Sequence, residues 1–315
     1  SQAYETLVAC QGRKAADAVS AVKESYANDK TPDGVEMTDE YIVPYVIGDY
    51  AGIKDGDVVM HTNYRQDRAI QLTQAFVCDD YEGTRSSRPR IAYLGFTRYW
   101  DEFEDYLLGA MGAGGGMDNL LGEVISKAGV RQLRIAETQK FRHVTSFFNG
   151  KSTKPYDGED QVNIPSRFDP ATFASHPEMD AYTVTEDLLK RLENNEYGFI
   201  AVNFANCDMV GHTGIFAAAK AAVEAVDKSV GRVYDAVMEM DGVMLITADH
   251  GNADKMYEED GSPFTAHTTF PVPFVVCGYD CTLREGGKLC DIAPTMLKIM
   301  GLEQPAEMTG ESIIK

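Results

Sequence analysis

Short apolar runs that alternate with helical segments constrain the fold of this chain more than any other feature. Beyond residue 116, the apolar runs occupy residues 132–136, 198–204, 242–248 and 272–277. The segments with helical character flank them, at residues 119–128, 180–194 and 291–300. Five valines between positions 223 and 237, at spacings of three and four, predict a further amphipathic helix. This order predicts an α/β fold with a mostly parallel sheet and helices on both faces.

The first 108 residues have the same mixed character. Helices are expected over residues 15–26 and 68–76, and strands over residues 57–63 and 90–96. The next segment, residues 109–116 (GAMGAGGG), holds five glycines in eight positions and is too flexible for a regular element, so we expect a hinge there. The sequence therefore predicts part of a second α/β domain over residues 1–108 and a larger domain over residues 117–315. Within the larger domain, residues 148–177 are expected to form a long polar loop.

Composition and charge exclude several classes of protein. With 315 residues, of which 44% are hydrophobic, the chain is long enough to bury a core in each of two domains. A formal net charge of −20 argues against nucleic acid as a partner, and no apolar run approaches the roughly 18 residues that a membrane span needs. The N-terminus lacks the layout of a signal peptide and the six cysteines are scattered singly. We therefore expect a soluble, cytoplasmic protein with reduced thiols.

Three short segments carry residues suited to binding metal ions. They contain Asp208 and His212, Asp249 and His250, and His267, which together use three of the six histidines. Two of the segments begin just past a predicted strand, at the sheet edge where α/β proteins bind ligands. Asp208 and His212 are four residues apart, so one turn of helix would place both side chains on one face. Each pair alone is common on protein surfaces, but their combination in loops between buried strands indicates a functional site.

The ligand types narrow the choice of metal. Mixed carboxylate and imidazole ligands favour Mn²⁺ or Zn²⁺ over Ca²⁺, which prefers oxygen ligands. Two such ions a few ångströms apart would clamp a phosphoryl group and activate a nucleophile. The segments therefore predict a two-metal site that handles phosphate.

Cationic residues in an acidic chain are the other candidates for binding an anion. Arg65 and Arg68 follow a predicted strand at a spacing of three, and would present one face to a carboxylate or phosphate. The alternative is a solvated helix on which both pair with neighbouring acids. Lys140 lies just beyond the predicted strand at 132–136, where a lysine is usually a solvated side chain.

Taken together, these motifs resemble those of the cofactor-independent phosphoglycerate mutases, which belong to the alkaline phosphatase superfamily. The metal motifs are NFANCDMVGHTG at residues 203–214, TADHGNA at residues 247–253 and TAHT at residues 265–268. These alone would indicate only the wider superfamily. NYRQDR at residues 63–68 and RIAETQK at residues 134–140 are similar to the mutases in particular. The resemblance covers essentially the whole chain and implies an alkaline-phosphatase-like fold.

The resemblance implies a role for each metal-binding candidate. Asp208, His212 and His267 would hold one Mn²⁺, and Asp249 with His250 would supply part of a second Mn²⁺ site, with Zn²⁺ as the alternative metal. No 2,3-bisphosphoglycerate would be needed, and members of the family are usually monomers.

The same resemblance implies the reaction. The family interconverts 3-phosphoglycerate and 2-phosphoglycerate, a step of glycolysis and gluconeogenesis, through a phosphoserine enzyme. Lys140 would neutralise the phosphoryl group in transit, and Arg65 with Arg68 would bind the phosphoglycerate. The glycine-rich hinge would let one domain close over the other.

One departure from the family limits this expectation. Family members begin with a segment that supplies a metal-binding aspartate, the nucleophilic serine and the start of the transferase domain, and no such segment precedes Ser1 here. We therefore expect the missing part in the same gene or in another chain, and expect the 315-residue chain alone to be inactive. The alternatives are another metal-dependent phosphatase or a phosphopentomutase of the superfamily, and a non-catalytic metal-binding remnant.

Overall fold

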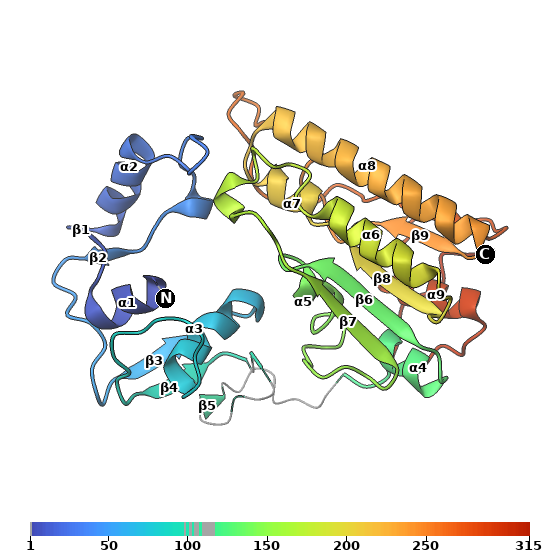
Figure 1. Cartoon of the computed structure of the whole chain (residues 1–315), viewed down its shortest axis with the longest axis horizontal. Helices are drawn as coiled ribbons and strands as arrows, with labels where there is room; N and C mark the ends of the chain where they lie inside the picture. Colours follow the sequence, from blue (N-terminus) through green and yellow to red (C-terminus); the bar gives the residue numbers. More distant parts are fainter. Residues whose placement is uncertain (1, 98, 101–102, 104–106, 109–116) are drawn as a thin grey trace. The chain divides into compact units, whose positions relative to one another are not determined.

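The computed structural model describes residues 2–97, 99–100, 103, 107–108 and 117–315. The chain divides into two compact units (Figure 1). The first contains residues 1–116 and 151–154, and the second contains residues 117–150 and 155–315. The predicted hinge at 109–116 lies outside the described residues.

The first unit is a small α/β body with two parallel sheets. Strands β1 and β2 form one sheet, and β3, β4 and β5 form the other in that order. Its helical elements are α1 (Gln2–Ala9), α2 (Ala18–Asn28), η1 (Asp39–Tyr41) and α3 (Asp67–Val77). Its strands are β1 (Arg13–Ala15), β2 (Tyr45–Ile47), β3 (Val58–His61), β4 (Ala92–Gly95) and β5 (Leu107–Leu108).

An aromatic core holds the first unit together. Tyr4 of α1, Phe76 of α3 and Tyr93 of β4 are almost fully buried and pack in one cluster, with the rings of Tyr4 and Phe76 4.7 Å apart. Residues 151–154 also belong to this unit. The Gln66 side chain donates a hydrogen bond to the Lys151 backbone carbonyl at 2.9 Å, which fixes the segment there.

The second unit contains the longer helices and the sheet that positions the candidate site. Its helical elements are α4 (Leu121–Lys127), α5 (Phe141–Val144), η2 (Pro170–Thr172), α6 (Ala181–Leu192), α7 (Asn206–Gly211), α8 (Phe216–Glu239), η3 (Leu289–Asp291) and α9 (Ile292–Met300). Its strands are β6 (Gln132–Glu137), β7 (Glu159–Ile164), β8 (Phe199–Asn203), β9 (Met244–Thr247) and β10 (Phe274–Cys277).

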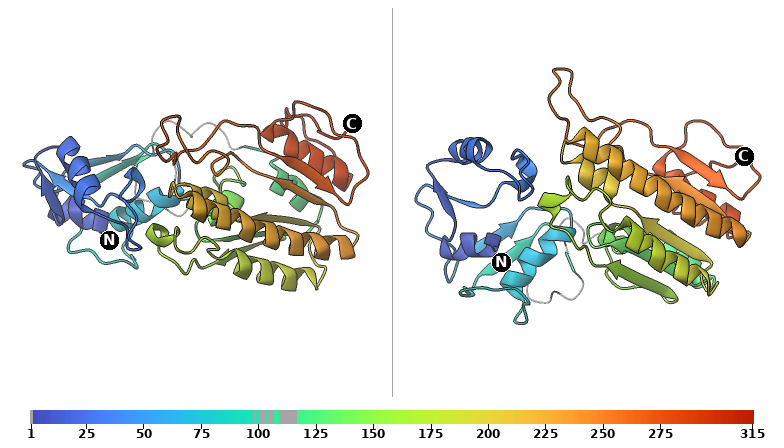
Figure 2. Two further views of the ribbon diagram at one scale, coloured as in Figure 1. Left: turned by 90° about the horizontal axis from the view of Figure 1, so that it is seen from above. Right: turned by 45° about the horizontal axis from the view of Figure 1, so that its top comes forward.

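Strand β6 is the centre of a parallel three-stranded sheet with β7 and β8 on either side. All six of its residues are buried, and their side chains alternate between the two faces of the sheet. Leu133 and Ile135 pack in one core with Leu188 of α6 and Val233 of α8. On the other face, Leu121 and Ile125 of α4 pack with Phe199 of β8 and Leu297 of α9. Figure 2 shows α6 and α8 together on one side of the strands and α9 on the other.

The predicted fold class is confirmed, since helices cover both faces of a parallel sheet. In the first unit, α1, β1 and β2 were not predicted. Two details of the second unit also differ from the prediction. The polar segment 148–177 is not a continuous loop, because it contains β7, which pairs with β6 over six residues. The last two strands, β9 and β10, pair in antiparallel orientation and form a sheet of their own. No helix within the described ranges is long and apolar enough to cross a membrane.

Candidate metal centre

The first part of the candidate site is the short helix α7, which follows β8 at the carboxyl end of the sheet. The backbone N–H of His212 donates to the Asp208 carbonyl at 3.1 Å and closes the last turn of this helix. The turn places both side chains on one face, with His212 Nε2 3.1 Å from Asp208 Oδ1. The four-residue spacing in the sequence therefore has the geometric consequence that a helix predicts.

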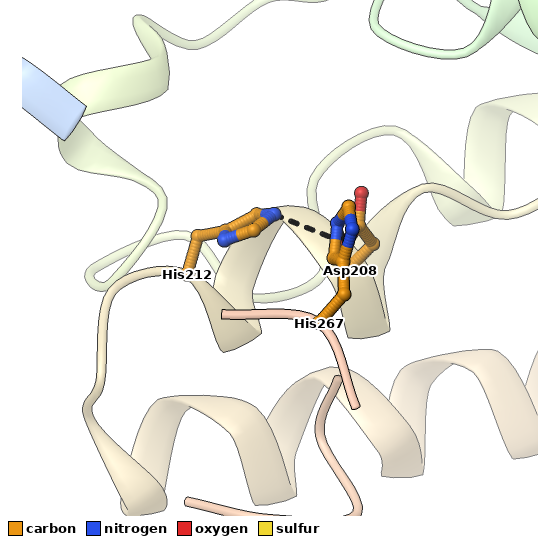
Figure 3. Close-up of side chains that lie close together, drawn as sticks. All are labelled: Asp208, His212 and His267. Atoms are coloured by element: carbon orange, nitrogen blue, oxygen red, sulfur yellow. Dashed lines mark hydrogen bonds and ion pairs between the residues drawn. The ribbon is translucent and has the colours of Figure 1, made fainter. Parts of the chain in front are cut away.

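His267 reaches the same carboxylate from a distant loop. The backbone N–H of Thr268 donates to the Gly251 carbonyl at 2.8 Å, and this contact holds the loop beside the segment that follows β9. His267 Nε2 then lies 3.1 Å from Asp208 Oδ1. Figure 3 shows the three side chains directed toward one another, Asp208 from α7, His212 from the C-terminal cap of that helix and His267 from the loop.

Three observations show that these residues fit a metal ion. One ligand atom from each of Asp208, His212 and His267 can be chosen so that all lie within 4.8 Å of one another. A tetrahedral ion with bonds of about 2.0–2.2 Å holds neighbouring ligand atoms roughly 3.3–3.6 Å apart, close to the two measured contacts. His212 Nδ1 lies 2.6 Å from the Thr265 carbonyl, which can only accept a hydrogen bond, so the proton of the neutral ring is on Nδ1. The other nitrogen, Nε2, then has a lone pair that faces an oxygen of the Asp208 carboxylate. A proton or a metal cation between these two acceptors satisfies both.

The charge state of His267 also suits metal binding. Burial lowers the pKa of His267, and the neighbouring His250 and His212 lower it further against the attraction of Asp208. A lowered pKa keeps the imidazole neutral at pH 7, which is the form that binds metals.

Lys140 joins the cluster from the central strand. It lies three residues past β6 and precedes α5, and its side chain is only 8% exposed. Its Nζ donates to Asp208 Oδ2, so the two carboxylate oxygens face different partners. Burial acts to raise the pKa of Asp208, but His212, Lys140 and Asn252 outweigh it and hold that pKa far below the usual range. These partners therefore favour the ionised form of Asp208, which is the form that binds a metal ion.

Asp249 and His250 lie next to this cluster. The rings of His250 and His267 stack with centroids 3.8 Å apart, and His250 Nε2 is 3.6 Å from Asp249 Oδ2. Asp249 is 55% exposed. In the part of the chain that the structure describes, these two residues do not form a tight group with a third metal-binding side chain, as Asp208, His212 and His267 do.

The two candidate arginines lie in the first unit. Both are exposed, with Arg65 just before α3 and Arg68 in its first turn. Arg68 lines a pocket of about 1270 Å³ together with His61 and Asn63 of the same unit. The helix therefore begins between the two arginines instead of carrying both on one face.

Two buried polar residues of the second unit were not singled out from the sequence. Asn252 donates its side-chain amide to Asp208 Oδ1 at 2.9 Å. Glu137, the last residue of β6, is 1% exposed and accepts a hydrogen bond from Ser166 Oγ at 3.0 Å. A glutamate directly after an apolar strand was the available signal for Glu137. No feature of the sequence pointed to Asn252, because an asparagine after a glycine is common in loops.

Glu137 gives the folded protein a measurable pH dependence. Burial raises the pKa of Glu137 from 4.5 to about 7, so between these values the folded state keeps a proton that the unfolded state has lost. Its contribution to stability therefore falls as the pH rises from 4.5 to 7 and then levels off. Glu137→Gln should gain stability over the wild type across this window, by up to about 3 kcal/mol, while keeping an acceptor for Ser166. Urea unfolding of both proteins at pH 5 and pH 8 measures the difference.

The control is Glu186→Gln, which removes an exposed carboxylate paired with Arg232 at 2.6 Å. Arg232 lowers the pKa of Glu186 from its ordinary value of 4.5, so the contribution of this pair changes only below about pH 4.5 and the stability of the variant relative to the wild type should be nearly the same at pH 5 and pH 8. An equal response of the two variants to pH would contradict the assignment of the effect to Glu137.

Comparison with known proteins identifies the class to which this fold and site belong. Residues 31–304 match the model of the Metalloenzyme superfamily, and the chain therefore belongs to this superfamily. Membership implies dependence on a divalent metal.

Within the superfamily, the chain is similar to one kind of enzyme. It is 47% identical to 2,3-bisphosphoglycerate-independent phosphoglycerate mutase 1 of Methanosarcina acetivorans, over 99% of this chain and 60% of that protein. It is 45% identical to the corresponding mutase of Clostridium botulinum, again over 99% of this chain and 60% of the relative. The crystal structure of Leishmania mexicana phosphoglycerate mutase at low cobalt concentration superimposes with a TM-score of 0.87 and 30% identity, covering 100% of this chain and 60% of that one. The chain thus spans about 60% of the length of these relatives.

Proposed function

We propose that this chain is the part of a phosphoglycerate mutase that binds the catalytic metal and the phosphoryl group, in an enzyme that interconverts 3-phosphoglycerate and 2-phosphoglycerate. One observation carries the proposal. The side chains of His212, His267 and Lys140 all contact the carboxylate of Asp208, at the carboxyl end of the sheet. The similarity to named mutases over the whole chain supports the choice of substrate.

In this proposal the carboxylates and imidazoles bind metal ions, and the lysine interacts with the phosphoryl group. Asp208, His212 and His267 hold one divalent cation, and Asp249 with His250 belongs to a second position. Such ions, when bound, activate a hydroxyl nucleophile and neutralise charge on the phosphoryl oxygens. Lys140 donates to Oδ2 of Asp208, and its ammonium group would neutralise charge on a phosphoryl group bound beside the ion. Lys140 and Asp208 are buried, so less water screens their charges. Burial would therefore strengthen the attraction of Asp208 for the metal ion and of Lys140 for the phosphoryl group.

The first unit has the chemistry to hold the organic part of the substrate. Arg65 and Arg68 offer planar guanidinium groups, which match the carboxylate or phosphate of phosphoglycerate. We propose that residues 1–108 are part of the transferase domain, that residues 109–116 form the hinge and that residues 117–315 form the metal-binding domain. Mn²⁺ is the metal we propose, with Zn²⁺ second, because two imidazoles and a carboxylate suit either. As a glycolytic enzyme, the protein would act in the cytoplasm.

An assay that couples 2-phosphoglycerate formation to enolase tests this function. The whole translated product of the gene should convert 3-phosphoglycerate with Mn²⁺ and lose at least about 100-fold in rate with a chelator.

Two results would contradict the proposal. Release of free phosphate without isomerisation by the gene product would indicate a phosphatase of the superfamily. Turnover by the gene product that persists unchanged in chelator would remove the metal from the reaction.

A further inference from the structure

Asn252 is a buried residue that the proposed reaction does not use. It lies past β9 in the segment that also carries Asp249 and His250, and it is 4% exposed. Its Nδ2 donates to two oxygens of the same residue, to Asp208 Oδ1 at 2.9 Å and to the Asp208 backbone carbonyl at 3.2 Å. One amide group therefore restrains both the side chain and the backbone of a candidate metal ligand.

The orientation of this amide follows from its partners. Both Asp208 atoms are acceptors, so the NH₂ of Asn252 must face them and Oδ1 must face away. Oδ1 then lies against Gly211 in α7, where a Cβ atom on the glycine would be 2.2 Å from it. Within the described residues, this buried oxygen has no hydrogen-bond donor. An unsatisfied buried carbonyl costs about 1–3 kcal/mol, so stability alone does not account for an asparagine here.

The same stretch of backbone holds the other half of the cluster. The carbonyl of Gly251 accepts the N–H of Thr268, the residue after His267. Gly251 and Asn252 thus connect the loop of His267 to the helix of Asp208 and His212. A shift of Asn252 would change the distances on which three ligand atoms depend.

We propose that Asn252 is a positioning residue that presents Asp208 to the metal ion, with Gly211 providing the space for its amide. The proposal rests on the metal site put forward above. With Nδ2 fixed on Oδ1, the carboxylate cannot rotate, so Oδ1 stays toward His212 and His267 while Oδ2 stays with Lys140. Partners of this kind around a metal ligand are typically worth 10–100-fold in metal affinity, which sets the expected size of the effect at roughly this range.

Metal titration of Asn252→Ala tests this role. We expect Mn²⁺ and Zn²⁺, each added alone and measured by competition with a chromophoric chelator, to bind about 10–100-fold more weakly than to the wild type. The matched control is Asn206→Ala. Asn206 lies in α7, the helix of Asp208, and is 0% exposed. It donates Nδ2 to the Pro177 carbonyl at 2.8 Å and, like Asn252, has an unsatisfied Oδ1 within the described residues. Its loss should lower stability by a similar amount and leave metal affinity unchanged.

A double-mutant cycle with Gly211 gives a second test that does not depend on one variant. Gly211→Ala introduces a Cβ whose three nearest atoms all belong to Asn252, so it should push the amide off Asp208 and weaken metal binding on its own. In the Asn252→Ala background the clash is gone. There, Gly211→Ala should cost nothing further, a non-additivity that independent structural damage does not produce.

Crystal structures of the metal-free wild type and Asn252→Ala separate this inference from the function on which it rests. The inference requires Asp208 Oδ1 to leave its position beside His212 and His267 when Asn252 is lost. Unchanged carboxylate geometry, unchanged metal affinity, or an equal loss of affinity in Asn206→Ala would each overturn it. If the wild type binds neither metal, the proposed function fails, and the carboxylate positions in the two metal-free structures still decide the role of Asn252.

Discussion

Replacing His267 with alanine is expected to weaken Mn²⁺ and Zn²⁺ binding by at least about 100-fold, because loss of a direct ligand should exceed the 10–100-fold typical of supporting residues. The three ligand atoms come from two separate segments, and His267 is the sole contribution of its loop to the three-residue group. Without it, a carboxylate and one imidazole on a single helical turn remain. Competition with a chromophoric chelator measures both affinities.

His176→Ala is the control for this prediction. His176 belongs to the same unit, where its ring stacks on Phe168 at 4.1 Å and Nδ1 contacts the Thr172 carbonyl. Its removal takes away a histidine and an aromatic contact, as the His267 variant does, but no member of the cluster. Its metal affinity should match the wild type. Unchanged affinity in His267→Ala would remove the cluster as the metal site.

The second large effect is on the stability of the protein without metal. Lys140 and Asp208 form an ion pair whose side chains are 8% and 15% exposed. Removing one partner of a buried pair costs about 3–5 kcal/mol, whereas replacing both is often neutral. Asp208→Asn should therefore destabilise the protein by about that amount, since it strands the ammonium of Lys140. Lys140→Met should cost less, because Asp208 keeps contacts with His212, His267 and Asn252.

Urea unfolding in the presence of a chelator gives the coupling energy of this pair. The double variant Lys140→Met/Asp208→Asn should recover at least about 2 kcal/mol relative to the sum of the single changes. The comparison pair is Arg131 and Glu196, which are 2.5 Å apart but nearly half exposed, and whose coupling should stay below about 1 kcal/mol. Additive losses at Lys140 and Asp208 would mean that the pair does not interact in solution.

The sequence predicted those parts of the fold that have a strong hydrophobic period. Helix α8 is an example, because its valines repeat at helical spacing. Of these valines only Val233 is buried, Val223 is exposed, and the rest of the buried face consists of Ala218, Ala219, Ala222, Ala225 and Ser229. Strand β7 was missed because EDQVNI has only two apolar residues, and its place in the sheet depends on pairing with β6. Pairing between strands that are distant in sequence leaves no local signal. The same limit applies to residues 151–154, whose contacts with the first unit arise only in the folded chain.

The candidate site follows a similar division. Asp208 and His212 were predicted to share a face because one helical turn fixes their relation. The position of His267 beside Asp208 depends on the β-bridge between Gly251 and Thr268. The spacing of these residues along the chain does not predict that bridge. The burial of Lys140 was also not evident, since a lysine past a strand is usually solvated. Its position follows from β6 and β8 ending at the same sheet edge, with Ala136 opposite Asn203.

Anomalous diffraction at the manganese edge, from crystals of the wild-type chain grown with Mn²⁺, would locate the proposed metal ion. We expect a peak about 2.0–2.2 Å from one oxygen of Asp208 and from Nε2 of both His212 and His267, and loss of that peak in crystals of His267→Ala. A strong peak elsewhere with these three side chains unliganded, or no peak at saturating Mn²⁺, would contradict this expectation.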